Sequence, residues 1–196
     1  MSDDPPTEIR LTDPRALRAY AHPTRMALVG LLRREGPLTA TRAAELLGTE
    51  SVASCSFHLR QLAKYGLVEE AGGGRGREKP WRATATFTSW DAAPDDPAAA
   101  TAGEALQRAV LDSHYERAVN WLAASADEPR EWREAAGAGD TVVQVTAAEL
   151  AELTERFAEL TRPYLERVRD PGRQPEGSRP VVLVQLALPA GPEVRR

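Results

Sequence analysis

The sequence predicts an α+β fold, and three observations support this prediction. Residues 13–65 divide into short segments with the apolar spacing of helices, separated by glycine and proline. A glycine-rich segment then lies between two strand-like segments. A long helical pattern follows, and the last third of the chain has a strand–helix–strand pattern. Helices combined with short strands in this order are typical of the α+β class.

The first helical segments begin and end at residues that favour helix termini. Proline is favoured at the first helical position, where no backbone N–H is needed, and glycine commonly follows the last turn. His22 precedes such a proline and is expected to cap the second helix. The expected elements are a flexible arm over residues 1–10, a short helix opened by Asp13-Pro14, a helix from His22-Pro23 to Gly36-Pro37, and helices over about 39–47 and 51–65.

A β-hairpin is expected after the fourth helix. Leu67–Glu70 and Lys79–Thr86 have the character of strands, and the glycines of residues 72–76 predict a flexible turn between them. Residues 91–103 contain three acids and no base among alanine, proline and threonine. This composition indicates either a linker or the lead-in to a helix.

The second half of the chain combines a long apolar helix with strand-like segments. The long helix has a broad apolar face that is expected to form a dimerisation surface, and Pro163 is expected to kink or restart the helix that contains it. Together the later elements predict a small C-terminal β-α-β region. The expected elements are a helix over about 98–126, a strand over 141–145, a helix opened by a Thr146/Glu149 capping box, and a strand over 181–188.

Composition and charge restrict the class of protein. A content of 42% hydrophobic and 28% charged residues is that of a globular protein rather than a disordered one. The net charge of −4 is unevenly distributed, because residues 9–82 carry 13 Lys/Arg against 7 Asp/Glu while residues 83–196 carry 12 against 19. The basic part is therefore the part suited to nucleic acid.

No apolar segment approaches the length of a membrane span and the start is acidic, so a cytoplasmic protein with no membrane partner is expected.

The helix over 51–65 has two chemically different sides. One side is expected to face the core, and the other offers hydroxyl, imidazole, amide and ammonium groups that suit a DNA groove. An ordinary solvated polar face is the alternative interpretation of the same pattern. With about 100° per residue, the first side holds Val52, Cys55, Ser56, Leu59, Leu62 and Ala63, and the second holds Ser54, Phe57, His58, Gln61 and Lys64.

The order of these parts resembles the ArsR-like winged helix-turn-helix regulators. The resemblance covers about residues 11–86 and is carried by LRAYAHPTRMALVGLL, ELLGTESVASCSFHLRQLAKYGLVEE and GGGRGREKPWR. It implies that the helix over 51–65 enters the major groove of double-stranded DNA, while the β-hairpin that follows, called the wing, lies along the backbone or minor groove. The DNA-binding residues implied are Ser54, Ser56, Phe57, His58, Gln61, Lys64, Arg75, Arg77 and Lys79, with Arg82 adding a fourth cation to the wing.

The metal ligands found in members of that family are largely missing from this sequence. A thiolate site needs paired cysteines, and the chain has only Cys55, which is expected to be buried and inert. Asp112 and His114 match the opening of a second family site, but only Glu128 remains of its second half. We therefore expect no metal and no cofactor.

The aromatic residues of the second half permit two interpretations. Trp121, Trp132, Phe157 and Tyr164 either line the pocket of a small organic effector or fill the core.

A phosphate loop, a nucleophile elbow and a metal-binding pair are all missing from the sequence, so we do not expect an enzyme.

The function expected is that of a homodimeric, sequence-specific transcription regulator, a repressor of a palindromic operator, because two-fold pairing doubles the DNA contacts of one module. The alternative is a winged-helix protein-interaction adaptor without sequence-specific DNA binding. The expected domains are a flexible arm at 1–10, the winged helix-turn-helix at 11–90, a linker or helix lead-in at 91–103, and the dimerisation helix with the C-terminal α/β region at 104–196.

Overall fold

The computed structural model describes residues 8–72 and 79–189, and the chain divides into two compact units, Met1–Asp140 and Thr141–Arg196. The predicted helices of the first unit are confirmed within a few residues. Each begins where a residue suited to a helix start was expected, as at Asp13, whose carboxylate accepts a hydrogen bond from the Arg15 backbone N–H at 2.7 Å. These helices are α1 (Pro14–Tyr20), α2 (Pro23–Glu35), α3 (Ala40–Leu47) and α4 (Val52–Lys64).

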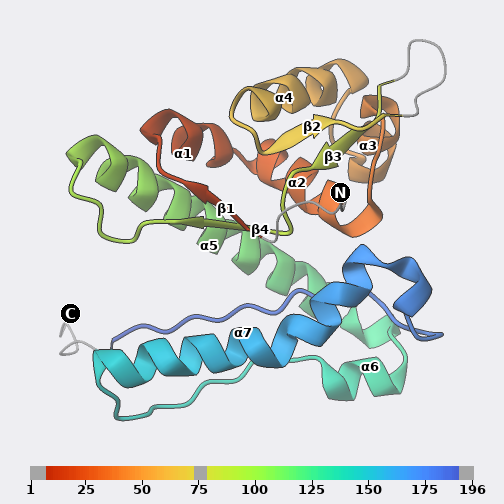
Figure 1. Cartoon of the computed structure of the whole chain (residues 1–196). Coiled ribbons are helices and arrows are strands. Elements are labelled where there is room, and N and C mark those ends of the chain that lie inside the picture. Colours follow the sequence, from red (N-terminus) through yellow and green to blue (C-terminus); the bar gives the residue numbers. More distant parts are fainter. Residues whose placement is uncertain (1–7, 73–78, 190–196) are drawn as a thin grey trace. The chain divides into compact units, whose positions relative to one another are not determined.

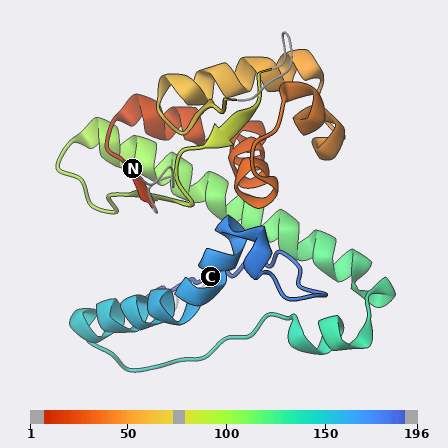
Figure 2. The same ribbon diagram turned by 45° about the vertical axis from the view of Figure 1, so that its right-hand side comes forward.

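The wing hairpin consists of β2 (Val68–Glu70) and β3 (Trp81–Ala83), which pair in antiparallel fashion (Figure 2). The connection from α2 to α3 also pairs with this sheet, through Leu38. The Leu38 N–H donates to the Trp81 carbonyl at 2.9 Å, and the Trp81 N–H donates to the Leu38 carbonyl at 2.8 Å. Trp81 is buried in the core, so the base of the wing is fixed to the helices.

The expectation of a flexible arm is wrong for residues 8–10. Glu8–Leu11 forms β1, which pairs in parallel with β4 (Phe87–Trp90), the segment that follows the wing (Figure 1). Leu11 is only 4% exposed and belongs to the core. Four residues are too few to show a strand pattern, and the partner strand lies at the other end of the domain in sequence, so no local pattern predicts the pair.

Arg33 of α2 holds the segment after the wing against the helices. Its Nε donates to the Ala85 carbonyl at 2.9 Å, and its terminal nitrogen donates to the Thr88 hydroxyl at 2.6 Å. Thr88 is buried at 6% exposure, and the Arg33 bond supplies its hydroxyl with a partner. The chain is thereby directed from β3 into β4 and on to the next helix.

The long helix α5 (Pro97–Ala124) begins inside residues 91–103, which selects the helix lead-in over the linker. The Asp96 carboxylate caps it by accepting from the Ala98 N–H at 2.9 Å. The first half of α5 packs on α1 and buries Ala99, Ala102, Gly103 and Leu106, but no residue of its second half is buried (Figure 1). A 3-10 turn (Ser125–Asp127) and the short helix α6 (Arg130–Ala135) follow, with Pro129 at the α6 N-terminus.

The second unit contains one long helix, α7 (Ala147–Arg169), and a 3-10 turn at Pro171–Arg173. The predicted capping box is confirmed, because the Thr146 N–H donates to a Glu149 carboxylate oxygen at 2.7 Å and the Glu149 N–H donates to the Thr146 hydroxyl at 3.3 Å. The helix continues through Pro163 as one element and does not restart there.

The predicted strands of the β-α-β region are not found. Residues 141–145 and 181–188 have no regular secondary structure, and their side chains are exposed, as for Val142 at 80% and Leu188 at 78%. A strand requires a neighbouring strand to satisfy its backbone groups, and an isolated pair of strands is only marginally stable. The α+β character of the described residues therefore comes from the first unit.

We predict that Leu11→Ala lowers the free energy of unfolding by about 2–5 kcal/mol, because it removes a buried side chain and leaves a cavity. Leu188→Ala, at an exposed position, is the matched control and should change it by less than about 0.5 kcal/mol. Urea unfolding of the full chain measures both values. Equal effects of the two substitutions would show that the N-terminal strand is not part of the core.

Candidate nucleic-acid interface

Helices α3 and α4 are joined by a tight turn that local interactions define. Thr39 caps α3 by accepting from the Arg42 N–H at 3.2 Å, and Ser51 caps α4 by accepting from the Ser54 N–H at 3.1 Å. Between them Gly48 has φ of 69°, a left-handed conformation that disfavours other residues. The sequence therefore specifies two helices with a sharp change of direction, the helix-turn-helix arrangement (Figure 2).

The core contacts of α4 determine which of its sides is free. Cys55, Leu59 and Leu62 have no exposed surface and pack against α2 and the rest of the core. The opposite side is solvent-exposed and includes Phe57 at 51%, together with Ala53, Arg60 and Lys64. No Asp or Glu occurs in α4, so the free side of the helix is cationic.

Two assignments from the helical pattern are corrected by this orientation. Val52 was expected in the core but is 46% exposed, because the core contacts begin one turn later at Cys55. Arg60 was on neither side of the predicted division, yet it is exposed and donates to the Ser56 hydroxyl at 3.0 Å. Arg60 follows Phe57 by three residues and precedes Lys64 by four, and this helical spacing is the sequence signal that could have identified it. Arginine is the side chain that most often contacts guanine.

Ser54 is part of an internal hydrogen-bond network at the start of α4. Its hydroxyl donates to one carboxylate oxygen of Glu50 at 2.6 Å, and the Thr24 hydroxyl of α2 donates to the other, also at 2.6 Å. These hydrogen bonds hold the pKa of Glu50 below its ordinary value. Glu50 thus links the first turns of α2 and α4, and in this structure the Ser54 hydroxyl is directed to that link.

His58 lies against His22, with ring centroids 4.6 Å apart, and Phe57 meets His58 edge-on at 5.3 Å. His22 occupies the N-cap position of α2, but its side chain makes no capping hydrogen bond, so the expected capping role of the imidazole is not found. The Nδ1 atoms of both rings are buried without a hydrogen-bond partner among the described residues. The imidazole pair therefore fills the space between the N-terminus of α2 and the middle of α4.

Burial and neighbouring charge make this pair reluctant to accept protons. Partial burial lowers the pKa of His22 and of His58, and the nearby Arg25 guanidinium lowers the pKa of each further. Glu50 acts in the opposite direction on both rings but is the smallest contribution. The neutral imidazole pair is thus the form that the folded protein favours.

The cations at the base of the wing have acidic partners. Lys79 Nζ lies 2.8 Å from a Glu70 carboxylate oxygen, and Arg82 Nε lies 2.8 Å from a Glu69 carboxylate oxygen. Both pairs are solvent-exposed across the β2–β3 hairpin, so each stabilises the fold only weakly. Arg75 and Arg77, the other predicted wing contacts, lie outside the described residues.

The aromatic residues predicted to line an effector pocket divide between the two units. Trp121 and Trp132 belong to the first unit and are partly buried, whereas Phe157 and Tyr164 belong to the second, with Tyr164 58% exposed. Two surface clefts of the first unit, beside α1, are lined by other residues. The effector pocket stays a prediction.

Cys55 is buried, and burial raises the pKa of its thiol, as expected for an inert cysteine. Within residues 8–72 and 79–189, no three His, Cys, Asp or Glu side chains come close enough to share a metal ion. In the same residues, no helix combines the length and apolar character needed to cross a membrane.

Comparison with known families agrees with this geometry. Residues 20–71, from the end of α1 past β2, match the family model of a helix-turn-helix domain. No curated protein matches the chain. The protein therefore contains a helix-turn-helix domain, the module with which transcription regulators bind DNA. The class that the fold and the match define is that of a DNA-binding regulator.

We predict that the free energy of unfolding decreases as the pH falls from about 7.5 to about 5.5. The pKa values of His22, His58 and His114 are all lowered from 6.5 in the folded protein, so the unfolded chain binds more protons in this range. The stability that these residues contribute is present above pH 6.5 and is lost as the pH falls through their folded-state values. Urea unfolding at several pH values measures the dependence.

His58→Phe keeps an aromatic ring beside His22 but removes one proton-binding group, so it should reduce the pH dependence. His114→Phe, at a position in α5 where burial and Arg117 lower the pKa, should reduce the dependence as well. Val142→Phe, at an exposed position, removes no imidazole and is the control. A pH-independent unfolding free energy, or an unaltered dependence in His58→Phe, would contradict the role of the imidazole pair.

Proposed function

We propose that this protein is an ArsR-like winged helix-turn-helix regulator that inserts α4 into the major groove and represses transcription from a palindromic operator. The observation that carries the proposal is the free side of α4, where Phe57, Arg60 and Lys64 are exposed, Gln61 is half-buried, and the helix contains no acid. Arginine and glutamine can form paired hydrogen bonds with guanine and adenine, and lysine can contact phosphate. Two of the three exposed side chains are cationic, which suits a polyanionic ligand.

The DNA-contact residues predicted from the sequence fall into two groups according to their surroundings. Phe57, Gln61 and Lys64 keep their proposed contacts with DNA, and Arg60 joins them. Ser54 and His58 act instead by holding α4 in position, since one is hydrogen-bonded to Glu50 and the other lies against His22. Ser56 supports Arg60 through the hydrogen bond between them.

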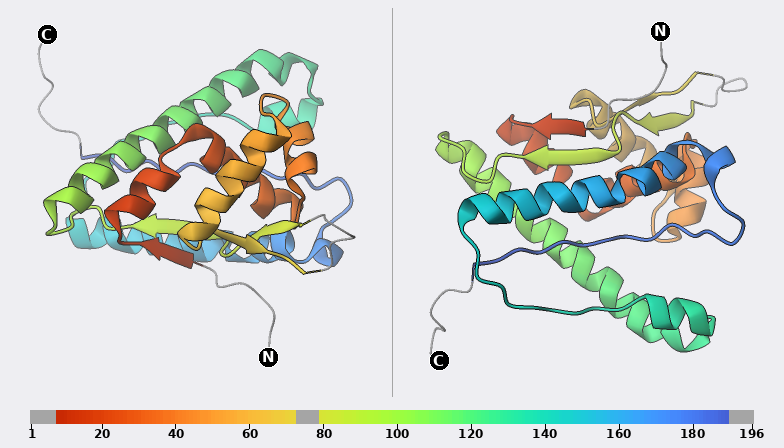
Figure 3. Two further views of the ribbon diagram at one scale, coloured as in Figure 1. Left: turned by 90° about the horizontal axis from the view of Figure 1, so that it is seen from above. Right: turned by 60° about the horizontal axis from the view of Figure 1, so that its bottom comes forward.

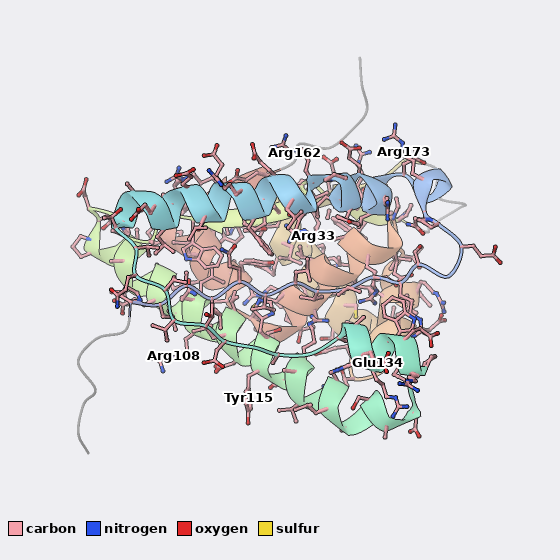
Figure 4. The ribbon with its side chains drawn as sticks, turned by 90° about the horizontal axis from the view of Figure 1, so that it is seen from below. Arg33, Arg108, Tyr115, Glu134, Arg162 and Arg173 are labelled. Atoms are coloured by element: carbon pink, nitrogen blue, oxygen red, sulfur yellow. The ribbon has the colours of Figure 1, made fainter. Side chains whose placement is uncertain are left out.

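The proposed assembly is a homodimer formed through the second half of α5. Tyr115 and Leu122 are each 72% exposed, and Val119 is 44% exposed. Spacings of four and three residues place these three on one side of the helix, and Figure 4 shows Tyr115 projecting away from it. A soluble monomer rarely exposes such a set of apolar side chains along one helix without a partner. A two-fold dimer would also place two α4 helices on the two halves of a palindrome.

The protein is proposed to bind DNA in the cytoplasm, with no catalytic role and no cofactor. The competing proposal is a protein-interaction adaptor. The adaptor is supported by the ion pairs of Lys79 and Arg82 with acidic residues, because these pairs leave less positive charge at the base of the wing for DNA. Duplex binding by the full-length protein distinguishes the two.

We predict that the full chain selects a specific duplex from a pool of random sequences. On that duplex, Arg60→Ala and Gln61→Ala should each cost about 1–3 kcal/mol of binding free energy and relax the base preference, because each removes hydrogen bonds to base edges. Arg133→Ala, an exposed arginine of α6, is the control for the loss of one charge and should change affinity little. Fluorescence anisotropy at fixed salt measures the affinities. Failure of the native protein to prefer any duplex would favour the adaptor.

We predict that Leu122→Glu makes the protein sediment as a monomer and weakens its binding to the full palindrome, because a carboxylate would be desolvated in the interface. Asn120→Glu introduces the same group on another side of α5 and should leave the dimer intact. Sedimentation velocity measures the mass. A Leu122→Glu protein that remains dimeric would assign the interface to another surface.

A further inference from the structure

A surface cleft lies where α1, the start of α2 and the end of α4 meet. Figure 3 shows α1 and α4 side by side in this part of the first unit. The cleft has a volume of about 310 Å³. It is lined by Arg15, Arg18, Ala19, Arg25, Gln61 and Tyr65.

The lining residues include three arginines and no aspartate or glutamate. Arg15 and Arg18 are three residues apart on α1 and both are exposed, while Arg25 of α2 is partly buried. Among the described residues none of the three arginines forms an ion pair, whereas Arg10, Arg42 and Arg82 pair with Asp91, Glu45 and Glu69. The cleft therefore concentrates positive charge that no acidic residue of the described chain pairs with.

Arg25 is the partly buried member of the three arginines that line the cleft. Its Nε is buried but has no hydrogen-bond acceptor within the described part of the chain. A buried donor without a partner is unfavourable, and the cost is larger for a charged group. Because this Nε has no solvent-accessible surface, an oxyanion in the cleft would contact the terminal guanidinium nitrogens of the arginines and not the Arg25 Nε. The planar guanidinium with its several donors suits phosphate in particular.

We propose that this cleft is a phosphate-binding site and that its ligand is a backbone phosphate of the duplex that α4 contacts. This inference rests on the proposed function. It is favoured over a free phosphorylated molecule because Gln61 lies in the cleft lining and also beside Arg60 on α4, so a phosphate held there lies next to the helix in the groove. The contact positions the protein on DNA from the side of α1 and α2, where the cations are unpaired. It does not depend on the wing.

The first test is the salt dependence of DNA binding by the full chain. The double variant Arg15→Ala/Arg18→Ala should weaken binding to the selected duplex and to a scrambled duplex alike. The slope of log affinity against log salt concentration should fall by about one for each phosphate that the variant no longer neutralises. Arg133→Ala/Arg162→Ala removes the same charge from two exposed arginines outside the cleft and should leave the slope unchanged. Figure 4 shows Arg162 at the surface of α7.

The salt slope of the cleft variant, compared with that of the control variant, decides whether the cleft binds phosphate. An unchanged slope in the cleft variant, or an equal decrease in the control, would overturn it. Arg15→Lys/Arg18→Lys keeps both charges at solvent-exposed positions, so it should retain most of the slope. If the native protein binds no duplex at all, the proposed function itself fails, and this outcome is distinct from a failure of the cleft alone.

The second test separates DNA from a small anion as the source of the phosphate group. Inorganic pyrophosphate should raise the thermal unfolding temperature of the native protein above that in sodium chloride of equal ionic strength, because a ligand of the folded state stabilises it. The Arg15→Ala/Arg18→Ala variant should not show this rise. A pyrophosphate effect combined with an unchanged DNA salt slope would assign the site to a small phosphorylated ligand and overturn the DNA assignment. No pyrophosphate effect on the native protein would overturn the phosphate site.

Discussion

The burial of one side of α4 is the constraint on which the rest of the structure depends. Cys55, Leu59 and Leu62 have no exposed surface, and the removal of each leucine from water stabilises the fold by roughly 1.5–3 kcal/mol. A surface ion pair contributes about 0–1 kcal/mol, so no charge interaction can turn the helix against this preference. Because the buried side is settled by hydrophobic packing, Phe57, Arg60 and Lys64 are presented to solvent as a consequence. The free side of the helix is thus decided by the core beneath it.

The distribution of ion pairs then separates the cations that stabilise the protein from those that remain available. Lys79 and Arg82 face the acids of the opposite strand, and Arg33 is used to hold the β4 segment to α2 through neutral oxygens. Arg15, Arg18 and Arg25 have no acidic partner within the described residues, and they meet at the junction of α1, α2 and α4. A count of basic residues along the chain does not distinguish the paired cations from the unpaired ones. Their surroundings show that the unpaired charge gathers around the helices rather than at the base of the wing.

The start of α2 and the start of α4 are connected by polar contacts as well as by the core. Thr24 and Ser54 both donate to Glu50, and the rings of His22 and His58 fill the adjacent space. These contacts connect the first turns of the two helices, next to the residues at which the helices begin. A change of protonation at the imidazole pair would place charge in a partly buried space beside Arg25, and this is the physical reason for the predicted loss of stability at lower pH.

The sequence by itself determined the features that depend on a few neighbouring residues. The starts of the helices, the glycine turn before α4 and the Thr146/Glu149 capping box could all be predicted, because caps and turns are local hydrogen-bond arrangements. Only the tertiary structure decided that Glu8–Leu11 pairs with β4, that Val52 is exposed while Arg60 is free, and that residues 141–145 and 181–188 remain outside any sheet. Strand pairing and the direction of a buried face depend on contacts between residues far apart in sequence. The cleft arginines were missed for the same reason, since they come from two helices that only folding brings to the end of α4.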